Sequence, residues 1–352
     1  TGADVERIVA DATDAAAMRD LAASTQVVVS TVGPYALYGS DLVAAVAEAG
    51  IGYCDLAGEP QWMRTMIDAH GATAEASGAR IVHACGFDSI PSDLGVWFTQ
   101  QQAIELLGEP CTSVALRVKA MKGGASGGTV ASMINMMTGS TRDAELREVL
   151  TNPYALAPEG MRTGSRQPNL SVPQHDKASG EWTAPFVMAA TNTRVVHRTH
   201  ALLGRPWGAD FRYDEAMLMG NGPIGATKAA AVTGCLAGFG GMAAIGPGRA
   251  LLGMMLPDPG EGPSPEAQEA GFFDIRLYGE TASGSKIVTG VTGDRDPGYG
   301  STAKMLAEAA LSLVDAPASE SGAGFLTPAT ALGNRLIERL TEHAGLSFDV
   351  II

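Results

Sequence analysis

Apolar and polar positions in the first hundred residues alternate between two kinds of segment. Short runs such as Gln26–Val32 (QVVVSTV) are rich in β-branched residues, which is typical of a strand buried on both faces. Longer segments such as Gln61–Ala76 place apolar side chains at helical spacing. This alternation predicts a parallel sheet with helices packed against it. We expect its strands at Arg7–Ala10, Gln26–Val32, Tyr53–Ala57 and Arg80–Ala84, and its helices at Asp14–Ala23, Ser40–Ala49, Gln61–Ala76 and from Ser92 onward.

The pattern changes after about residue 110, where strands with one exposed face and longer connections follow. We expect an α+β domain with a mainly antiparallel sheet in this part. Its predicted strands are Ser113–Ala120, Val187–Val196, Phe272–Tyr278 and Ser285–Thr292, and its predicted helices are Val130–Thr138, Ser301–Val314 and a last helix from Thr327 to about Ala344.

The predicted domains follow from this change. Residues 1–110 form the C-terminal part of an NAD(P)-binding Rossmann domain, and residues 111–325 form a substrate or dimerisation domain. Residues 326–352 form a helix that packs back on the first domain. The fold class is therefore α/β, with a partial, doubly wound parallel sheet beside the α+β domain. The glycine fingerprint GxGxxG of a Rossmann domain is absent from the first hundred residues. We expect the missing strand–helix–strand unit to precede Thr1.

Three loops follow the predicted parallel strands at their carboxyl ends, where sheets of this kind bind ligands. They are Gly33–Tyr35, Gly58–Pro60 and Gly86–Pro91. Each contains glycine, which lets a ligand approach the backbone closely, and each leads into a helix start, which favours anions.

Three sequence segments around these loops resemble the saccharopine dehydrogenase-like oxidoreductases. They are Val28–Gly39 (VVSTVGPYALYG), Tyr53–Pro60 (YCDLAGEP) and Cys85–Gly95 (CGFDSIPSDLG). Within that group the chain is most similar to the mycobacterial trans-acting enoyl reductase family. Later segments extend the resemblance over nearly the whole chain: Asn192–Arg198, Phe211–Gly220, Asp296–Lys304 and Leu326–Leu336.

The resemblance implies that the chain binds NADP (as NADPH) and that hydride passes to the β-carbon of an enoyl thioester. Such a substrate would belong to polyketide-type lipid synthesis and would be held on the carrier domain of a synthase. The cofactor-binding residues that it implies are Asp11, Ala12, Val32, Gly33, Pro34, Tyr35, Asp55, Gly58, Glu59, Gly86, Phe87 and Asp88. Two of these acids have a plain structural alternative, because Asp55 could bond within the fold and Asp88 could cap a helix.

Reduction of an enoyl thioester needs a hydrogen-bond donor for the charge on the thioester oxygen and an acid that supplies a proton. The hydroxyls nearest the expected nicotinamide are those of Tyr35, Tyr38 and Ser89. We predict Tyr35 and Ser89 as the catalytic residues. The saccharopine reaction itself is disfavoured, because Ser89, Ile90 and Leu94 replace residues typical of that branch.

Composition narrows the range of partners. The net charge of −14 argues against a nucleic-acid partner. The four cysteines, Cys54, Cys85, Cys111 and Cys235, form no CxxC pair, so we interpret them as buried thiols in the reducing cytoplasm. His197 and His200 have no third ligand nearby in the sequence, and we expect no metal site.

Residues 216–256 contain a Gly/Ala-rich apolar stretch, which includes 20 uncharged residues between Lys228 and Arg249. Its length matches a membrane span, but Gly and Ala provide little transfer energy and Pro247 interrupts the run. The alternatives are a helical hairpin that contacts a membrane or an acyl chain, and a helix that is buried or forms a homodimer. For the chain as a whole, the alternative to an enzyme is a non-catalytic, nucleotide-binding or membrane-associated scaffold with the same fold.

Overall fold

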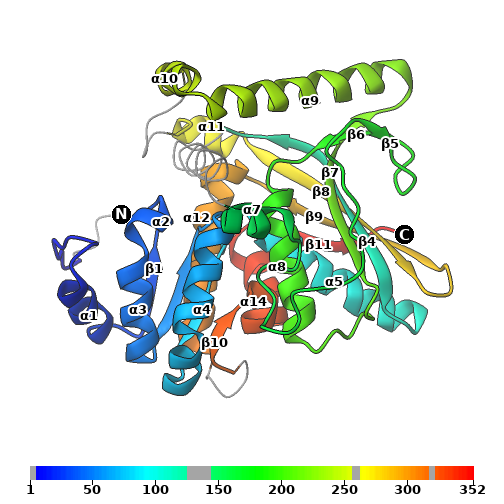
Figure 1. Ribbon diagram of the computed structural model, residues 1–352. Helices are drawn as coiled ribbons and strands as arrows, with labels where there is room; N and C mark the ends of the chain where they lie inside the picture. The colour runs from blue at the N-terminus through cyan, green and yellow to red at the C-terminus, as the bar shows by residue number, and fades with distance from the viewer. Residues whose placement is uncertain (1–4, 125–143, 256–261, 317–321) are drawn as a thin grey trace.

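A computed structural model describes residues 5–124, 144–255, 262–316 and 322–352 of the chain (Figure 1). Its first sheet has four parallel strands in the order β1–β2–β3–β10. These strands are β1 (Val27–Ser30), β2 (Gly52–Asp55), β3 (Arg80–Val82) and β10 (Gly324–Leu326). The three strands from the first hundred residues confirm the predicted parallel sheet. The fourth strand comes from a part of the chain more than two hundred residues away.

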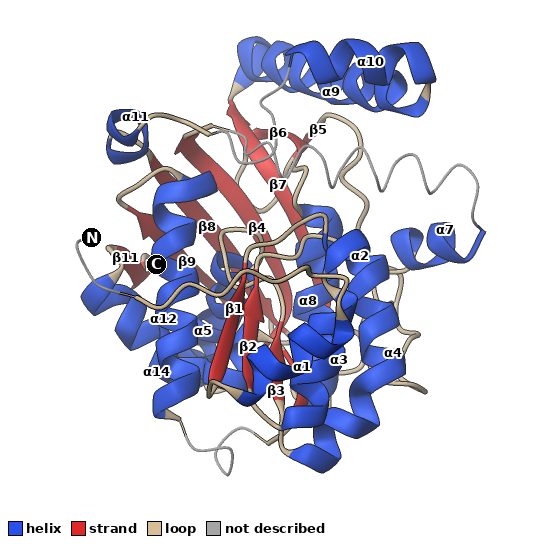
Figure 2. Ribbon diagram, turned by 90° about the vertical axis from the view of Figure 1, so that its left-hand side faces the viewer, coloured by secondary structure: helices blue, strands red, loops and turns tan. Residues whose placement is uncertain are grey.

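Helices cover both faces of this sheet. On one face lie α1 (Ala15–Ala23), α3 (Ser40–Ala49) and α4 (Pro60–Ser77), with the short α2 (Tyr35–Tyr38) near the carboxyl end of β1 (Figure 2). The carboxylate of Asp14 starts α1 by accepting from two of its first backbone N–H groups. On the other face lie α12 (Thr302–Asp315) and α14 (Pro328–His343).

The second sheet has seven strands in the order β11–β9–β8–β4–β7–β6–β5. Only the β4–β7 pair is parallel, so the predicted mainly antiparallel sheet is confirmed. Its strands are β4 (Cys111–Lys122), β5 (Gln174–His175), β6 (Trp182–Pro185), β7 (Arg212–Gly220), β8 (Phe272–Thr281), β9 (Lys286–Gly293) and β11 (Leu346–Val350).

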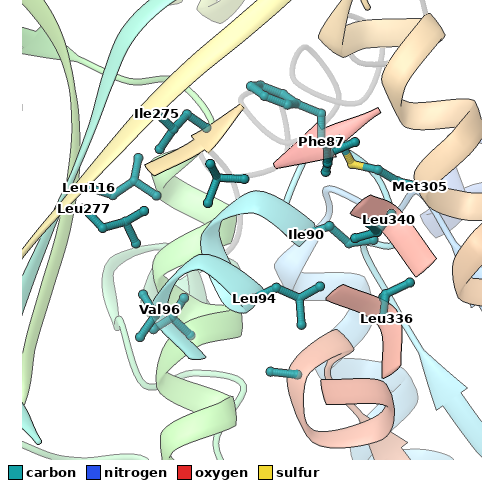
Figure 3. Packing of buried hydrophobic residues seen from close by; sticks show 14 of the residues in the cluster. Phe87, Ile90, Leu94, Val96, Leu116, Ile275, Leu277, Met305, Leu336 and Leu340 are labelled. Carbon is teal, nitrogen blue, oxygen red and sulfur yellow. The ribbon is translucent and has the colours of Figure 1, made fainter. Parts of the chain in front are cut away.

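One helix, α5 (Ile90–Leu107), lies between the two sheets. Figure 3 shows Ile90, Leu94 and Val96 of this helix among side chains from both sides. Leucines and an isoleucine of β4 and β8 pack on one side, and side chains of α12 and α14 pack on the other. Because apolar side chains of both sheets join one buried cluster through α5, the relative position of the two halves is fixed by burial.

The remaining helices connect or cap the sheets. Of these, α8 (Ala189–Leu202) packs between α5 and β7, and the π-helix η1 (Pro297–Ser301) leads into α12. The short helices α7 (Ala144–Thr151) and α11 (Pro265–Glu269) lie in the connections.

The helices α9 (Gly222–Ala244) and α10 (Gly246–Met255) form a hairpin that lies outside the second sheet, beyond β6 and β7 (Figure 2). None of the helices in the described ranges is long and apolar enough to cross a membrane alone. Only α9 together with residues Gly246–Leu252 reaches that length and composition, and this pair is bent by 116°.

Two predicted strands are wrong. Arg7–Ala10 has no regular structure, and within the described ranges no strand pairs with it. Val187–Val196 lies largely in α8, because Asn192, Val195 and Val196 recur at helical spacing and are buried together. The predicted helix Val130–Thr138 lies outside the described residues.

The domain boundaries also differ from those predicted. Both α12 and β10 precede residue 326, but they pack with the parallel sheet rather than with the second sheet. After α14 has packed against β3 and α5, the chain continues into β11 and adds an edge strand to the second sheet. The two halves therefore exchange segments near the C-terminal end.

Candidate functional site

The loops that follow β1, β2 and β3 meet at the carboxyl edge of the parallel sheet. They are Gly33–Tyr35, Leu56–Glu59 and Gly86–Ser89. The backbone N–H of Leu56 donates to the hydroxyl oxygen of Tyr35 (3.1 Å), which joins the first loop to the second. The structure thus brings together the three loops that the sequence predicts as one site.

Glu59 holds the first loop in place. Its buried carboxylate accepts from the backbone N–H of Tyr35 (2.9 Å) and from that of Ala36 (3.2 Å), at the start of α2. The Gly33–Pro34 peptide bond just before this point is cis. A carboxylate at a helix start satisfies N–H groups that have no partner within the helix. The side chain of Glu59 therefore shapes the loop from inside the protein.

Asp55 has a similar internal role at the end of β2. One carboxylate oxygen accepts from the backbone N–H groups of Ala57 and Ala84, each at 3.0 Å. The other accepts from the hydroxyl of Tyr53 (3.0 Å) and lies 2.7 Å from Nδ1 of His83. Asp55 is fully buried, and Ala84 adopts a positive φ of 59°. The structural alternative for Asp55 thus agrees with its contacts: its carboxylate fixes the turn after β3.

The hydroxyls predicted as catalytic are both engaged within the fold. The Tyr35 hydroxyl donates to the carbonyl of Ser30 (3.0 Å), and burial raises the pKa of Tyr35 well above its usual value. The Ser89 hydroxyl is fully buried and donates to Oδ1 of Asn192 on α8 (3.0 Å). Neither hydroxyl is free to donate to a bound molecule in this arrangement.

Behind Ser89 the hydrogen bonds continue to the second sheet. Nδ2 of Asn192 donates to Glu215 (2.9 Å), and the hydroxyl of Tyr213 donates to the other oxygen of the same carboxylate (2.6 Å). Burial raises the pKa of Glu215 to about 7. A chain of buried polar groups therefore runs from the third loop through α8 to β7.

The third loop also contacts η1 and α12. The backbone N–H of Phe87 donates to Oγ1 of Thr302 (2.9 Å), and that hydroxyl donates to the carbonyl of Pro297 (2.7 Å). A Cβ on Gly86 would lie 2.7 Å from Leu56 and 2.9 Å from Thr302, so only glycine fits here without a shift. The carboxylate of Asp296 fixes η1 by accepting from the backbone N–H of Tyr299 (2.7 Å).

The side of the loops away from the core remains open. Val32 and Gly33 are exposed, and no atom of the described residues lies within 4 Å of the position that a Cβ on Gly58 would take. Asp88 is half-buried, with buried residues on either side. Exposed backbone and open space at the carboxyl edge of a parallel sheet suit the flat ring and ribose of a nicotinamide cofactor. The residues at this edge therefore fit such a group.

The other predicted cofactor residues, Asp11 and Ala12, lie in the turn before α1. The Asp11 carboxylate is exposed and accepts from the backbone N–H of Thr13 (2.9 Å) and from its hydroxyl (2.8 Å). These hydrogen bonds lower the pKa of Asp11. Its contacts are local, and no hydrogen bond in the described ranges links it to the three loops.

His197 and His200 lie in an aromatic cluster on α8. His200 stacks on Trp207 (ring centroids 4.9 Å apart), and its Nε2 lies 2.9 Å from the carbonyl of Gly208. Burial lowers the pKa of His197 to about 3 and that of His200 to about 4, which keeps both rings neutral near pH 7. No cluster of three or more metal-ligating side chains occurs among the described residues.

The four cysteines are free thiols. Cys54, Cys85 and Cys111 are buried, as predicted. Cys235 on α9 is exposed, so the prediction of a buried thiol is wrong there.

Sequence reasoning missed four side chains that shape the site. Asn192 and Glu215 build the polar chain behind Ser89, and Asp296 and Thr302 hold the segment next to Phe87. All four lie in segments that carry the resemblance. The segments were therefore visible in the sequence, but the contacts between them were not.

Several known proteins are similar to the chain over almost its whole length, although no protein-family model matches it. It is 41% identical over 97% of its residues to a Mycobacterium tuberculosis protein provisionally named trans-acting enoyl reductase, and it covers 83% of that protein. It is 39% identical to the trans-acting enoyl reductase of Mycobacterium bovis (96% and 83% covered) and 37% identical to that of Mycobacterium leprae (95% and 82%).

Among solved structures, the chain resembles apo saccharopine dehydrogenase (L-Glu forming) from Saccharomyces cerevisiae. The TM-score is 0.51, with 11% identity, and the match covers 98% of this chain and 89% of that one. This likeness supports the fold. The sequence identities above 35% over nearly all of the chain show the family as well. The chain therefore belongs to the trans-acting enoyl reductase family of oxidoreductases, on a saccharopine dehydrogenase-like fold.

Proposed function

We propose that the chain uses NADPH to reduce the carbon–carbon double bond of an enoyl thioester. The observation that carries this proposal is the open edge where the loops after β1, β2 and β3 meet, in a chain of the enoyl reductase family. That edge offers exposed backbone beside a half-buried carboxyl, and its other acids are used within the fold.

NADPH would supply the hydride that enters the β-carbon of the substrate. The backbone of residues 32–34 and Gly58 would contact the cofactor from the parallel-sheet side, and Gly86–Asp88 would contact it from the third loop. Asp55, Glu59 and Tyr35 would act as positioning residues, because each bonds within the loops. Ser89 would likewise hold the third loop against α8 rather than touch the substrate.

The thioester would reach this edge on the carrier domain of a polyketide synthase. The relatives are named trans-acting, a term for a reductase that serves a synthase as a separate protein. A carrier domain that delivers the acyl chain needs a surface around the site on which it can dock. The path from that surface to the reacting carbon can then be short. The half-buried position of Asp88 agrees with such access.

The hairpin of α9 and α10 would rest on an anionic lipid surface. Only Gly225, Ala229 and Ala243 of the 23 residues in α9 are buried, although apolar residues surround the whole helix. Such a helix is normally covered. The charged side chains in residues 221–257 are Lys228 and Arg249, both cationic in a chain whose net charge is −14. Their sign matches lipid phosphates, and like charge opposes pairing with a second hairpin.

Cofactor binding and turnover test the main proposal in two steps. The purified protein should quench NADPH fluorescence more strongly than that of NADH, and it should then oxidise NADPH when an enoyl thioester is added. Tight NADPH binding without turnover on any enoyl thioester, free or carried by a synthase domain, would favour the non-catalytic scaffold and contradict the proposal.

A further inference from the structure

Asp88 is the one residue between Ala79 and Val96 that is not buried. The segment forms β3, the third loop and the first turns of α5, and it lies in the core on either side of this carboxyl. Asp88 is therefore the point at which this buried segment reaches the open edge of the site.

The backbone around Asp88 is fixed from both sides. On one side Phe87 bonds to Thr302, and on the other Ser89 bonds to Asn192. The backbone N–H of Ile90 also donates to the carbonyl of Gly86 (2.9 Å), which closes the loop beneath Asp88. A loop anchored at three points holds a carboxyl in one position, as a catalytic group requires.

The Asp88 carboxyl itself makes no hydrogen bond or ion pair with any residue in the described ranges. In this respect it differs from Asp55 and Glu59, whose carboxylates are each held by backbone N–H groups. A structural acid is normally satisfied by such donors. An unpaired carboxyl at an open edge is instead available to a bound molecule.

The charges around Asp88 favour its neutral form. Its burial and the negative charge of Asp55 on β2 raise its pKa to about 7. The charged group that acts on Asp88 is Asp55 on β2, and the charge of Asp88 in turn contributes to raising the pKa of Tyr35. No lysine or arginine forms an ion pair with Asp88 in the described ranges.

We propose that Asp88 is the acid that protonates the α-carbon of the substrate, an inference that rests on the proposed enoyl reduction. Once the hydride has entered the β-carbon, the electron pair of the double bond moves to the thioester and forms an enolate. The O–H bond of Asp88 then breaks, its proton forms the new C–H bond at the α-carbon, and the carboxylate regains a proton from solvent. The competing hydroxyls of Tyr35 and Ser89 are engaged elsewhere, which leaves the exposed Tyr38 as the nearest alternative.

The test compares Asp88→Asn with Tyr38→Phe. In the unchanged protein, kcat should be constant at acidic pH and fall by about tenfold per pH unit above a pKa of about 7. Asp88→Asn should lower kcat by about 10²–10⁴-fold and abolish this pH dependence. Asp88→Glu should restore part of kcat, because it returns an acid to the loop.

Infrared spectroscopy provides a second test that does not depend on turnover. The difference infrared spectrum between the unchanged protein and Asp88→Asn should contain the band of one protonated carboxyl below a pH of about 7 and lose it above that pH, because the bands of the other buried acids cancel. Equal kcat values for the unchanged protein and Asp88→Asn, or loss of the pH dependence in Tyr38→Phe alone, would overturn the role of Asp88. Failure of the unchanged protein to reduce any enoyl thioester would instead overturn the proposed function.

Discussion

Gly86 and Gly58 occupy loops after neighbouring strands, but their surroundings differ. The Cα of Gly86 faces side chains of Leu56 and Thr302 at close range, whereas that of Gly58 faces open space. Neither glycine has a positive φ, so alanine is compatible with both backbones. Gly86 is therefore constrained by packing within the site, whereas Gly58 borders the space that a ligand would occupy.

Replacing each glycine by alanine tests this difference. Gly86→Ala should lower the free energy of unfolding by about 1–3 kcal/mol, because the new methyl group overpacks the contact with Leu56 and Thr302. Gly58→Ala should leave the stability nearly unchanged and weaken NADPH binding, because its methyl group enters the open space of the site. Denaturant unfolding and NADPH fluorescence titration measure the two effects. A Gly86→Ala protein as stable as the unchanged protein, or unchanged NADPH affinity in Gly58→Ala, would contradict these roles of the two glycines.

The hairpin of α9 and α10 illustrates what an element contributes beyond its residues. Its side chains are ordinary one by one, since single exposed apolar residues are common on protein surfaces. Together they form an apolar surface whose charged side chains are Lys228 and Arg249, and on which Ile224 is 72% exposed, Ile245 57% and Leu251 44%. Neither helix alone is long and apolar enough to cross a membrane, and the pair is bent by 116°, which suits contact with the surface of a membrane rather than a span.

Vesicle flotation tests this contact. The unchanged protein should float with anionic phospholipid vesicles, and Leu251→Glu should reduce the bound fraction, because the new charge would enter the lipid interface. Leu106→Glu is the matched control, since Leu106 is 58% exposed at the end of α5, away from the hairpin. Lys228→Gln should weaken binding by about fivefold, which corresponds to about 1 kcal/mol for one cation.

Two outcomes would contradict the lipid contact. One is binding to neutral vesicles as strong as binding to anionic ones. The other is a dimer in solution that Leu251→Glu dissociates while flotation stays unchanged, which would assign the hairpin to a second copy of the chain.

At the scale of the whole molecule, α5 unites the two sheets, and Asp93 is a buried acid in its first turn. The Asp93 carboxylate accepts from the hydroxyl of Thr199 on α8 and from the backbone N–H of Ala329 on α14 (2.8 Å). The side chain is fully buried, and burial raises its pKa to about 6. One acid thus joins three helices that are far apart in the sequence.

This pKa predicts how stability depends on pH. Because the pKa of Asp93 is higher in the folded protein than in the unfolded chain, its stabilising contribution is complete below about pH 4 and is lost as the pH rises through about 6. Relative to Asp93→Asn, the unchanged protein should lose on the order of 2–3 kcal/mol of unfolding free energy across that range. Urea unfolding at several pH values measures the difference. A difference that stays constant with pH would contradict the prediction.

Local sequence patterns were sufficient to predict much of the fold and the loops of the site. The β-branched run at Gln26–Val32 is confirmed as a strand of the parallel sheet, and the glycine- and proline-rich loops after β1, β2 and β3 meet as expected. The alternation of apolar and polar positions also correctly predicts β8 and β9. The pattern failed at Val187–Val196, because β-branched residues also occur on the buried face of a helix, and their burial depends on what packs beside them.

The sequence by itself determined the fold class, the family and the three loops, because strand periodicity, turn residues and long motifs are local properties of the chain. Only the tertiary structure decided the roles of individual side chains. Asp55, Glu59, Tyr35 and Ser89 look alike in the sequence as polar residues in loops, but their hydrogen bonds show that each is engaged internally. Asp88 differs from them in its lack of such partners among the described residues, and that difference depends on backbone groups brought together from distant segments.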